Sequence, residues 1–319
     1  MKLIKFGGTS LQTPTLVNNA IEIIKKYDDK TLVVVSAIGR KGFPYSTQTL
    51  IESLKERKIS NKEYDRFLLI GEIFSSVFFS NEIKNSGLKA YALSFKEMGL
   101  KCDNNYGDGN IISLDCKKIN ELFTEYQVLI IPGFGGLSNQ DEPIIFGRGG
   151  SDLTLVLCAE MLKEKNITLF KDIDGVYPTI KYPLTKIRPY ENLSYDECLT
   201  LCEIGYDVIN QKALKEAKKN NITIEIENFN QNMNRTIISS KPSNKKVIGF
   251  NIVNNTFYLS TFFVEEVILE IDEILKKRNI FIKNYEQMGN YFIFNVIASQ
   301  TLLVRQVILS TYFSDMLKN

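Results

Sequence analysis

Short apolar or β-branched runs alternate with longer helical patterns along the first 240 residues, and this alternation constrains the fold more than any other feature. The runs are KLIKF (2–6), TLVVVSA (31–37), LKAYAL (88–93), QVLIIPGF (127–134), ITLFKDI (167–173) and ITIEIENF (222–229). Helices are expected between them, at 16–27, 61–85, 151–165, 194–205 and 207–219. Continuous apolar strands that alternate with helices are typical of a mainly parallel sheet with helices on both faces. We therefore expect an α/β fold.

The pattern changes after about Lys241. Strand-like stretches at 256–263, 280–285 and 290–299 and helical stretches at 264–279 and 301–317 follow in the order β-α-β-β-α. This order predicts a small α+β, ferredoxin-like unit without its last strand. The polar stretch SSKPSNKK (239–246) indicates a boundary, so we expect one domain at 1–240 and a second at 246–319.

The chain of 319 residues contains no histidine. This excludes Ser-His-Asp and Cys-His nucleophilic sites, histidine general bases and most catalytic zinc sites. Transfer of a phosphoryl group to a carboxylate remains possible, because that nucleophile is already ionised at neutral pH. Lysines, backbone amides and Mg²⁺ suffice for such a reaction. The five cysteines form no C-x-x-C pair, and we interpret them as buried free thiols.

Charge and hydropathy limit the expected partners and location. A net charge of +2 arises from 39 basic and 37 acidic residues that are well mixed, which indicates neither a nucleic-acid nor a membrane surface. No apolar run is long enough to span a bilayer, and the N-terminus lacks the apolar core of a signal peptide. We expect a cytoplasmic protein.

Glycine-rich turns follow four of the expected strands. They are Gly7-Gly8-Thr9-Ser10, Ser36-Ala37-Ile38-Gly39, Gly133-Phe134-Gly135-Gly136 and Gly147-Arg148-Gly149-Gly150-Ser151-Asp152. In open α/β sheets, ligands bind at the carboxyl ends of the strands, where backbone amides and helix N-termini hold phosphate. None of the turns is a Walker A loop, and none fits G-x-G-x-x-G after the first strand. The pattern predicts an anion site of another kind.

Specific motifs in these turns carry a resemblance to a known family. KFGGTSL (5–11), GEIFS (71–75), FGRGGSDLT (146–154) and DIDGVY (172–177) resemble the signature elements of aspartate kinases, within the amino acid kinase family. The resemblance runs in order over roughly residues 1–240. It implies the amino acid kinase fold and an ATP-dependent phosphotransferase that phosphorylates the β-carboxylate of L-aspartate to 4-phospho-L-aspartate, in amino-acid biosynthesis.

The resemblance also implies roles for individual residues. Lys5 would contact the transferred phosphoryl group, Glu72 would receive the substrate amino group, and Arg148 would bind the α-carboxylate. The implied catalytic residues are Lys5 and Asp152; the implied substrate-binding residues are Thr9, Ser10, Glu72, Arg148, Gly150 and Ser151. The implied nucleotide-binding residues are Gly7, Gly8, Lys171, Asp172, Asp174 and Tyr177. Mg²⁺ would arrive bound to ATP, near Asp172 or Asp174, and no protein-only metal site is implied.

The nucleotide half departs from the family pattern. The usual Asp-Pro-Arg after the DIDGVY turn is replaced by residues 180–182, Ile-Lys-Tyr, and the usual Gly-Ala-Lys-Val is replaced by residues 205–208. The second change puts Asp207 in place of a lysine that approaches the ATP phosphates, so attraction becomes repulsion. The lysines near the lost cations are Lys171, Lys181 and Lys212. Each of them either restores the missing charge or is simply a solvated lysine.

Three hypotheses follow. The first is an active aspartate kinase. The second is a catalytically degenerate homologue that binds an amino acid or regulates a partner. The third is a kinase of the same family with another acidic amino acid or another phosphoryl donor. The C-terminal part resembles a single incomplete ACT domain; its open sheet edges favour a homodimer, and the absence of a second module puts effector binding between paired modules in doubt.

Overall fold

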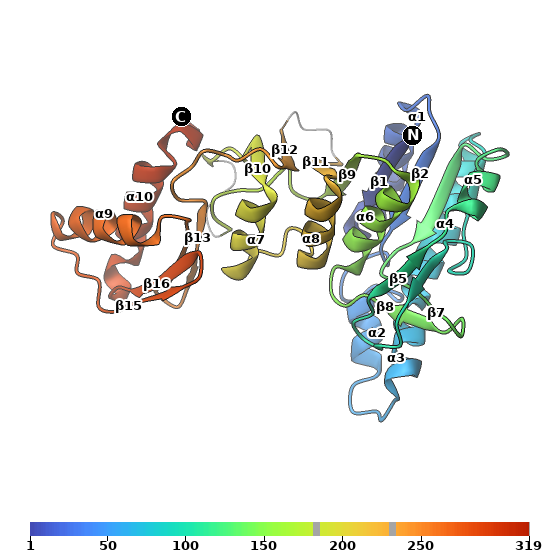
Figure 1. Cartoon of the computed structure of the whole chain (residues 1–319), viewed down its shortest axis with the longest axis horizontal. Helices are drawn as coiled ribbons and strands as arrows, with labels where there is room; N and C mark the ends of the chain where they lie inside the picture. Colours follow the sequence, from blue (N-terminus) through green and yellow to red (C-terminus); the bar gives the residue numbers. More distant parts are fainter. Residues whose placement is uncertain (181–185, 230–233, 319) are drawn as a thin grey trace. The chain divides into compact units, whose positions relative to one another are not determined.

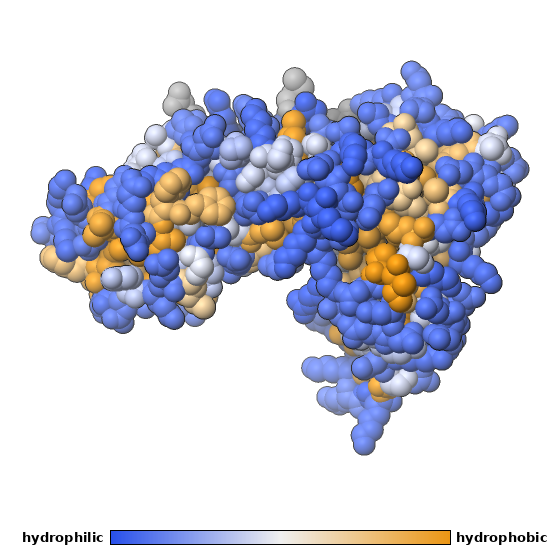
Figure 2. Space-filling view, in the orientation of Figure 1, coloured by the Kyte–Doolittle hydropathy of each residue, from blue (hydrophilic) through white to orange (hydrophobic). Residues whose placement is uncertain are grey.

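The computed structural model describes residues 1–180, 186–229 and 234–318. The chain divides into two compact units. The first contains Met1–Asp174 and Lys212–Met233, and the second contains Gly175–Gln211 and Asn234–Asn319. Within the described residues, no helix has both the length and the apolar character needed to cross a membrane. The face of the molecule drawn in Figure 2 is mostly hydrophilic, with scattered apolar patches.

A parallel sheet forms the centre of the first unit (Figure 1). Its strands lie in the order β11-β9-β1-β2-β6-β3, and every neighbouring pair is parallel. They are β1 (Lys2–Phe6), β2 (Thr31–Val35), β3 (Ala90–Ala92), β6 (Val128–Pro132), β9 (Asn166–Lys171) and β11 (Thr223–Asn228). Five of these strands lie inside the expected apolar runs, and β9 begins one residue before its run, at Asn166. The predicted parallel sheet is confirmed.

Helices cover both faces of this sheet. Side chains of α1 (Pro14–Lys25) and α4 (Ile70–Asn85) join Ile4 and Phe6 of β1 in one buried apolar cluster. Helix α6 (Gly150–Leu162) packs against β1, β2 and β9. Because successive side chains of a strand point to opposite faces, Lys5 points away from the α1 and α4 side. The remaining helices of this unit are η1 (Gly8–Leu11), α2 (Thr47–Ser53), α3 (Asn61–Leu68), α5 (Lys117–Leu122) and, apart from its first residue, α8 (Gln211–Asn220).

The single helix expected at 61–85 is wrong in one respect, since it is broken into α3 and α4 at Leu69. Just after this break, the lack of a side chain on Gly71 allows the backbone of α4 to pack closely against the segment that contains Tyr45. A Cβ on Gly71 would lie 2.3 Å from the carbonyl oxygen of Tyr45. The expected helix at 207–219 also begins later, at Gln211, so Asp207 precedes it in sequence.

A second, smaller sheet of the first unit was not predicted. Its strands lie in the order β5-β4-β7-β8 and are β4 (Leu100–Cys102), β5 (Ile111–Leu114), β7 (Gly135–Ser138) and β8 (Pro143–Ile145). The pair β4–β7 is parallel and the other two pairs are antiparallel. Strand β8 leads directly into the Gly147–Asp152 turn, so this sheet supports one of the expected site motifs.

The second unit contains an antiparallel sheet in the order β13-β14-β16-β15. Its elements are β13 (Gly249–Val253), β14 (Thr256–Ser260), α9 (Val264–Lys276), β15 (Tyr285–Met288), β16 (Tyr291–Asn295) and α10 (Thr301–Tyr312). The predicted ferredoxin-like order is present, and β13 lies beside β14, at the edge that the missing last strand would occupy. The strand expected at 280–285 is wrong: β15 begins at Tyr285, because the hairpin at Gly289 (φ +58°) pairs Met288 with Tyr291.

The same unit includes residues well before the expected boundary at 239–246. Strand β10 (Asn192–Ser194) pairs in parallel with β12 (Arg235–Ser239), and α7 (Tyr195–Glu203) follows β10. The Tyr206 hydroxyl donates a hydrogen bond to the Phe250 carbonyl of β13 (3.2 Å), and the Glu197 carboxylate accepts from the Ser243 amide (2.9 Å). The boundaries between the compact units therefore do not coincide with the polar stretch at 239–246. The division into domains at 1–240 and 246–319 stays a prediction.

Candidate active site

Three charged side chains meet at one edge of the parallel sheet. Lys5 stands near the carboxyl end of β1 and Lys171 is the last residue of the adjacent strand β9. Asp152 lies in the first turn of α6, which packs against both strands. Its Oδ1 is 3.0 Å from Lys5 Nζ, an ion pair without hydrogen-bond geometry, and its Oδ2 accepts a hydrogen bond from Lys171 Nζ, also at 3.0 Å.

Burial strengthens the electrostatic interactions among these three side chains and acts on the pKa values of Asp152 and Lys5. Burial acts to raise the pKa of the Asp152 carboxyl, but Lys171 and Lys5 outweigh it and hold that pKa at about 2. For Lys5, burial is the largest influence and lowers the pKa of the ammonium, while Asp152 acts in the opposite direction. Two ammonium groups and one carboxylate leave one net positive charge in a poorly solvated place. Such a cluster attracts an anion more strongly than surface lysines do.

The first glycine turn lies against this cluster. A Cβ on Gly7 would be 3.9 Å from Lys5 Nζ and 4.0 Å from Ser10 Oγ. The Ser10 hydroxyl is fully buried and has no hydrogen-bond partner among the described residues. Gly8 faces the second turn so closely that a Cβ would lie 2.2 Å from the Ala37 carbonyl oxygen. The turn therefore brings backbone and an unpaired hydroxyl close to Lys5, as an anion site requires.

Glu72 is buried in the first turn of α4. Its Oε1 accepts a hydrogen bond from the Ala37 amide at 3.1 Å, while Oε2 has no hydrogen-bond partner among the described residues. Burial raises the pKa of this carboxyl to about 8, although the Ala37 amide and Lys5 both act to lower it. A buried carboxyl with one unpaired oxygen is suited to receive a cation such as a substrate ammonium.

The GRGGSD motif forms the turn before α6. Gly147 and Gly149 have positive φ angles of 77° and 70°, and Arg148 between them is exposed. Gly150 and Ser151 are buried, and a Cβ on Gly133 would lie 2.7 Å from Ser151 Oγ, which shows how closely two glycine turns approach. The binding roles expected for these residues, and for the half-buried Thr9, stay predictions.

The residues expected to bind the nucleotide do not all lie in the charged cluster around Asp152. Lys171 belongs to the Asp152 cluster, and the exposed Asp172 forms an ion pair with Arg40. Asp174 is half-buried, whereas Tyr177 is buried within the second unit. Lys181 and Tyr182 lie outside the described residues, and Lys212 pairs with Asp108 instead of standing free. The nucleotide roles therefore stay predictions.

Sequence reasoning missed several contacts of these residues. Arg40 follows the second glycine turn and reaches Asp172, but no motif marked it. Ser75 Oγ accepts a hydrogen bond from the Ile38 amide at 2.9 Å, and the motif GEIFS contained the signal. Asp65, which binds two backbone amides, had no signal in the sequence pattern. In the described part of the chain, no group of three or more Cys, Asp or Glu side chains is arranged to hold a metal ion.

A separate cavity of about 590 Å³ lies in the first unit. It is lined by Gly109 and Asn110 of the loop before β5 and by residues of β5, α6 and α8, including Ile112, Leu157 and Lys215. Lys212, one of the lysines expected near the lost cations, lines it, but none of the expected catalytic, substrate-binding or nucleotide-binding residues does. The charged cluster around Asp152, rather than this cavity, is therefore the candidate active site.

Comparison with known proteins identifies the family of this chain. The model of the family described as "Amino acid kinase family" matches residues 1–228. The chain belongs to the amino acid kinase family. Among curated members, it is 32% identical over 243 residues to an aspartokinase of Helicobacter pylori, covering 74% of this chain and 59% of that protein. It is 30% identical over 252 residues to aspartokinase 1 of Bacillus subtilis, covering 77% and 62%. The chain thus spans about three-fifths of these relatives.

Solved structures share the fold of this chain. Escherichia coli aspartokinase III, solved in complex with aspartate and ADP, superposes with a TM-score of 0.65 at 19% identity, covering 99% of this chain and 84% of that one. Uridylate kinase of Archaeoglobus fulgidus superposes with a TM-score of 0.52 at 17% identity, covering 75% of this chain and all of that one. At these identities the likeness establishes the amino acid kinase fold and no more.

Proposed function

We propose that this family member transfers the γ-phosphoryl group of ATP to the β-carboxylate of L-aspartate, giving 4-phospho-L-aspartate and ADP. The buried cluster of Lys5, Asp152 and Lys171 carries the proposal, because it places excess positive charge beside a glycine turn at the edge of the sheet. The aspartokinase relatives at about 30% identity support the choice of substrate.

The reaction needs no general base. A β-carboxylate oxygen attacks the γ-phosphorus, the bond from that phosphorus to the β,γ-bridging oxygen breaks, and ADP leaves with the electron pair. Because the carboxylate is already ionised at neutral pH, the protein's task is to position the reactants and to stabilise charge. Lys5 would neutralise charge on the phosphoryl oxygens, and Asp152 would hold both Lys5 and Lys171 in place.

The remaining residues would hold the two substrates. Glu72 would receive the α-ammonium of aspartate on its unpaired oxygen, and Arg148 would bind the α-carboxylate with two hydrogen bonds. Mg²⁺ would enter with ATP, with Asp172 or Asp174 beside it. Asp172 fits this role because its present partner, Arg40, is 70% exposed, and exposed ion pairs exchange at little cost.

Trapping with hydroxylamine tests the proposal directly. Acyl phosphates react with hydroxylamine to give a hydroxamate, so the wild-type protein with ATP, Mg²⁺ and L-aspartate is expected to produce aspartyl hydroxamate. Lys5→Met is the matched blank, because it keeps the length of the side chain and removes the charge. Wild-type protein that is folded and yields no more hydroxamate than Lys5→Met contradicts the proposal.

A second function is favoured by two observations. Asp152 already pairs with both lysines of the cluster, and the chain carries Asp207 where the family pattern has a lysine. A homologue that binds aspartate without phosphorylating it is the corresponding hypothesis. Calorimetry with aspartate and with Mg-ATP separates the two functions: a pure binding protein takes up aspartate alone. Asp207→Lys is then expected to raise the affinity for ATP, and an unchanged affinity argues against charge reversal as the cause.

We also propose that the protein forms a homodimer through the second unit. Among the described residues, β15 is at the end of its sheet order, and its four residues are exposed. An open edge strand can pair with another chain. Sedimentation equilibrium tests this: Gln287→Pro removes a backbone donor from β15 and is expected to shift the protein toward monomer, whereas Glu286→Gln keeps that donor and is the control.

A further inference from the structure

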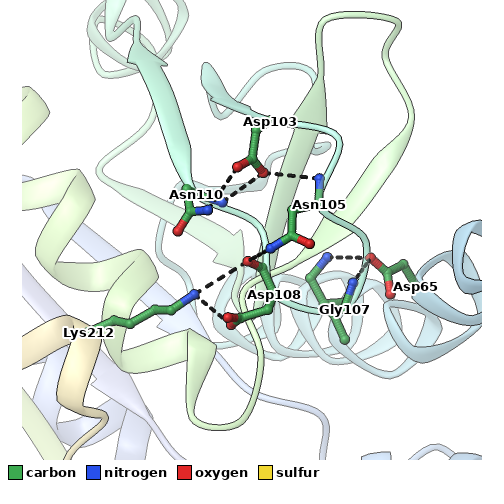
Figure 3. A network of polar contacts seen from close by, with 8 residues as sticks. Asp65, Asp103, Asn105, Gly107, Asp108, Asn110 and Lys212 are labelled. Atoms are coloured by element: carbon green, nitrogen blue, oxygen red, sulfur yellow. Dashed lines mark hydrogen bonds and ion pairs between the residues drawn. The ribbon is translucent and has the colours of Figure 1, made fainter.

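One loop of the first unit is held by side chains from two helices that are distant in sequence (Figure 3). We call this loop, residues 103–110, the brace segment. Asp65 of α3 contacts it at Gly107, and Lys212 of α8 contacts it at Asp108. Within the segment, the Asp103 carboxylate accepts hydrogen bonds from the Asn110 amide (3.0 Å) and from the Asn110 side chain (2.8 Å). Hydrogen bonds therefore link the two ends of the brace segment to each other, and contacts to α3 and α8 hold its middle.

Asp65 joins the brace segment to the strand that leads to Arg148. Its side chain is fully buried, and its Oδ2 accepts hydrogen bonds from the amides of Gly107 (2.9 Å) and Ile145 (3.1 Å). Burial raises the pKa of this carboxyl, and the two amides act against burial. Ile145 is the last residue of β8 and precedes Arg148 by three positions. One buried oxygen thus fixes two backbone segments together.

The brace segment also touches the arginine turn itself. The Gly109 amide donates a hydrogen bond to the Ile145 carbonyl at 2.8 Å. A Cβ on Gly147 would lie 2.7 Å from Asp108 Oδ1, so this carboxylate stands against the residue before Arg148. Any shift of Asp108 would therefore also displace the backbone just before Arg148.

Lys212 fixes Asp108 from the other side. Its Nζ lies 2.5 Å from Asp108 Oδ1 and 3.4 Å from the Asp108 carbonyl oxygen. The Asn105 side chain donates to the same carbonyl at 2.8 Å. The Lys212 side chain is 35% exposed and that of Asp108 is 60% exposed, so the pair stabilises the fold little and acts mainly by orienting Asp108.

We propose that Asp65 and Lys212 are positioning residues for Arg148, acting through the brace segment. This inference rests on the proposed function, in which Arg148 binds the α-carboxylate of aspartate. Bidentate binding by a guanidinium depends on its angle and distance, and small misplacements weaken it strongly. Neither residue contacts the substrate in this account, and both set the geometry of the residue that does.

Kinetics of two variants test the inference. Asp65→Asn keeps the size of the side chain and removes its charge, and it is expected to raise the KM for aspartate roughly tenfold or more. Lys212→Met is expected to raise it about threefold, because the pair it removes is partly exposed. In both variants kcat and the KM for ATP stay close to wild type. Lys219→Met is the control, since Lys219 lies on the same helix and pairs with Glu216.

A double-mutant cycle identifies the route. If Lys212 acts through Asp108, the variant that combines Lys212→Met with Asp108→Asn has a KM for aspartate no higher than Asp108→Asn alone. Additive effects of the two changes contradict the route through Asp108. Because Asp65→Asn disturbs a buried group, its thermal stability is measured alongside, and Lys212→Met decides the matter if Asp65→Asn does not fold.

Amide hydrogen exchange and aspartate affinity separate failure of this inference from failure of the proposed function. Both variants are expected to speed exchange in the peptide that covers 145–150, whether or not the protein is a kinase. Wild-type protein that binds aspartate without turnover refutes the kinase function, and the affinities of the variants for aspartate then test the positioning role. Faster exchange with unchanged KM and unchanged affinity overturns the positioning role, and so does an equal rise of KM in Lys219→Met.

Discussion

The carboxyl of Glu72 should release a proton when aspartate binds. With a pKa of about 8, roughly nine-tenths of the Glu72 carboxyls are protonated at pH 7. A substrate ammonium beside the carboxyl favours its charged form and lowers that pKa. We therefore expect the uptake of aspartate at pH 7 to release close to one proton per site.

Calorimetry in two buffers measures this release. The observed binding enthalpy at pH 7 should differ between phosphate, whose ionisation enthalpy is small, and Tris, whose ionisation enthalpy is large. The difference should vanish in Glu72→Gln, which cannot ionise, provided that this variant still binds at high aspartate concentration. Measurable binding by the wild type with equal enthalpies in both buffers would refute the role of Glu72 as the ammonium acceptor.

The same shift has a consequence for stability that needs no ligand. The unfolded state ionises Glu72 near its usual pKa of 4.5, whereas the folded state keeps the proton until about pH 8. Raising the pH between these values therefore favours the unfolded state, by about 4 to 5 kcal/mol at most. Glu72→Gln should lose this part of the pH dependence of the melting temperature. Glu82→Gln on the same helix is the control and should follow the wild type.

Three further predictions concern the cluster and the turns around it. Lys171→Met leaves Asp152 with one partner and should lower turnover about 10²- to 10³-fold with aspartate affinity unchanged; turnover near wild type in a hydroxamate assay contradicts a charge-stabilising role. Gly8→Ala places a Cβ 2.2 Å from the Ala37 carbonyl oxygen and should cost about 1 to 3 kcal/mol in chemical denaturation; wild-type stability would show that the turn can shift freely. Arg40→Ala breaks an exposed ion pair and should change the free energy of unfolding by less than about 1 kcal/mol, and a larger loss would mean that the pair has a structural role.

The middle of the central sheet could be predicted because strands β1, β2 and β6 are buried on both faces. Strands such as Thr31–Val35 are continuous apolar runs, and this pattern is local in sequence. The short strands of the second sheet gave no such signal. Leu100–Cys102 and Pro143–Ile145 have three residues each, which is too short for any periodicity. Strand β13 was missed because it joins its sheet from the N-terminal side, against the expected order of elements.

The candidate site was predictable to the extent that motifs mark it. Lys5 and Glu72 lie in stretches whose residue types and spacing are specific. The pairing of Lys171 with Asp152 required the strand order, since only the adjacency of β9 and β1 brings Lys171 to the cluster. Asp65 lies 42 and 80 residues from its two partners, and no local pattern can encode contacts of that range.

Phosphorus NMR of the complete reaction is the most direct test of the central claim. The sample holds wild-type protein, Mg-ATP and L-aspartate, with Lys5→Met as the parallel sample. In the wild-type sample, the γ-phosphoryl signal of ATP is expected to disappear and an acyl phosphate signal to appear only when aspartate is present. An ATP spectrum that stays unchanged in the presence of aspartate, from wild-type protein shown to be folded, would contradict the central claim.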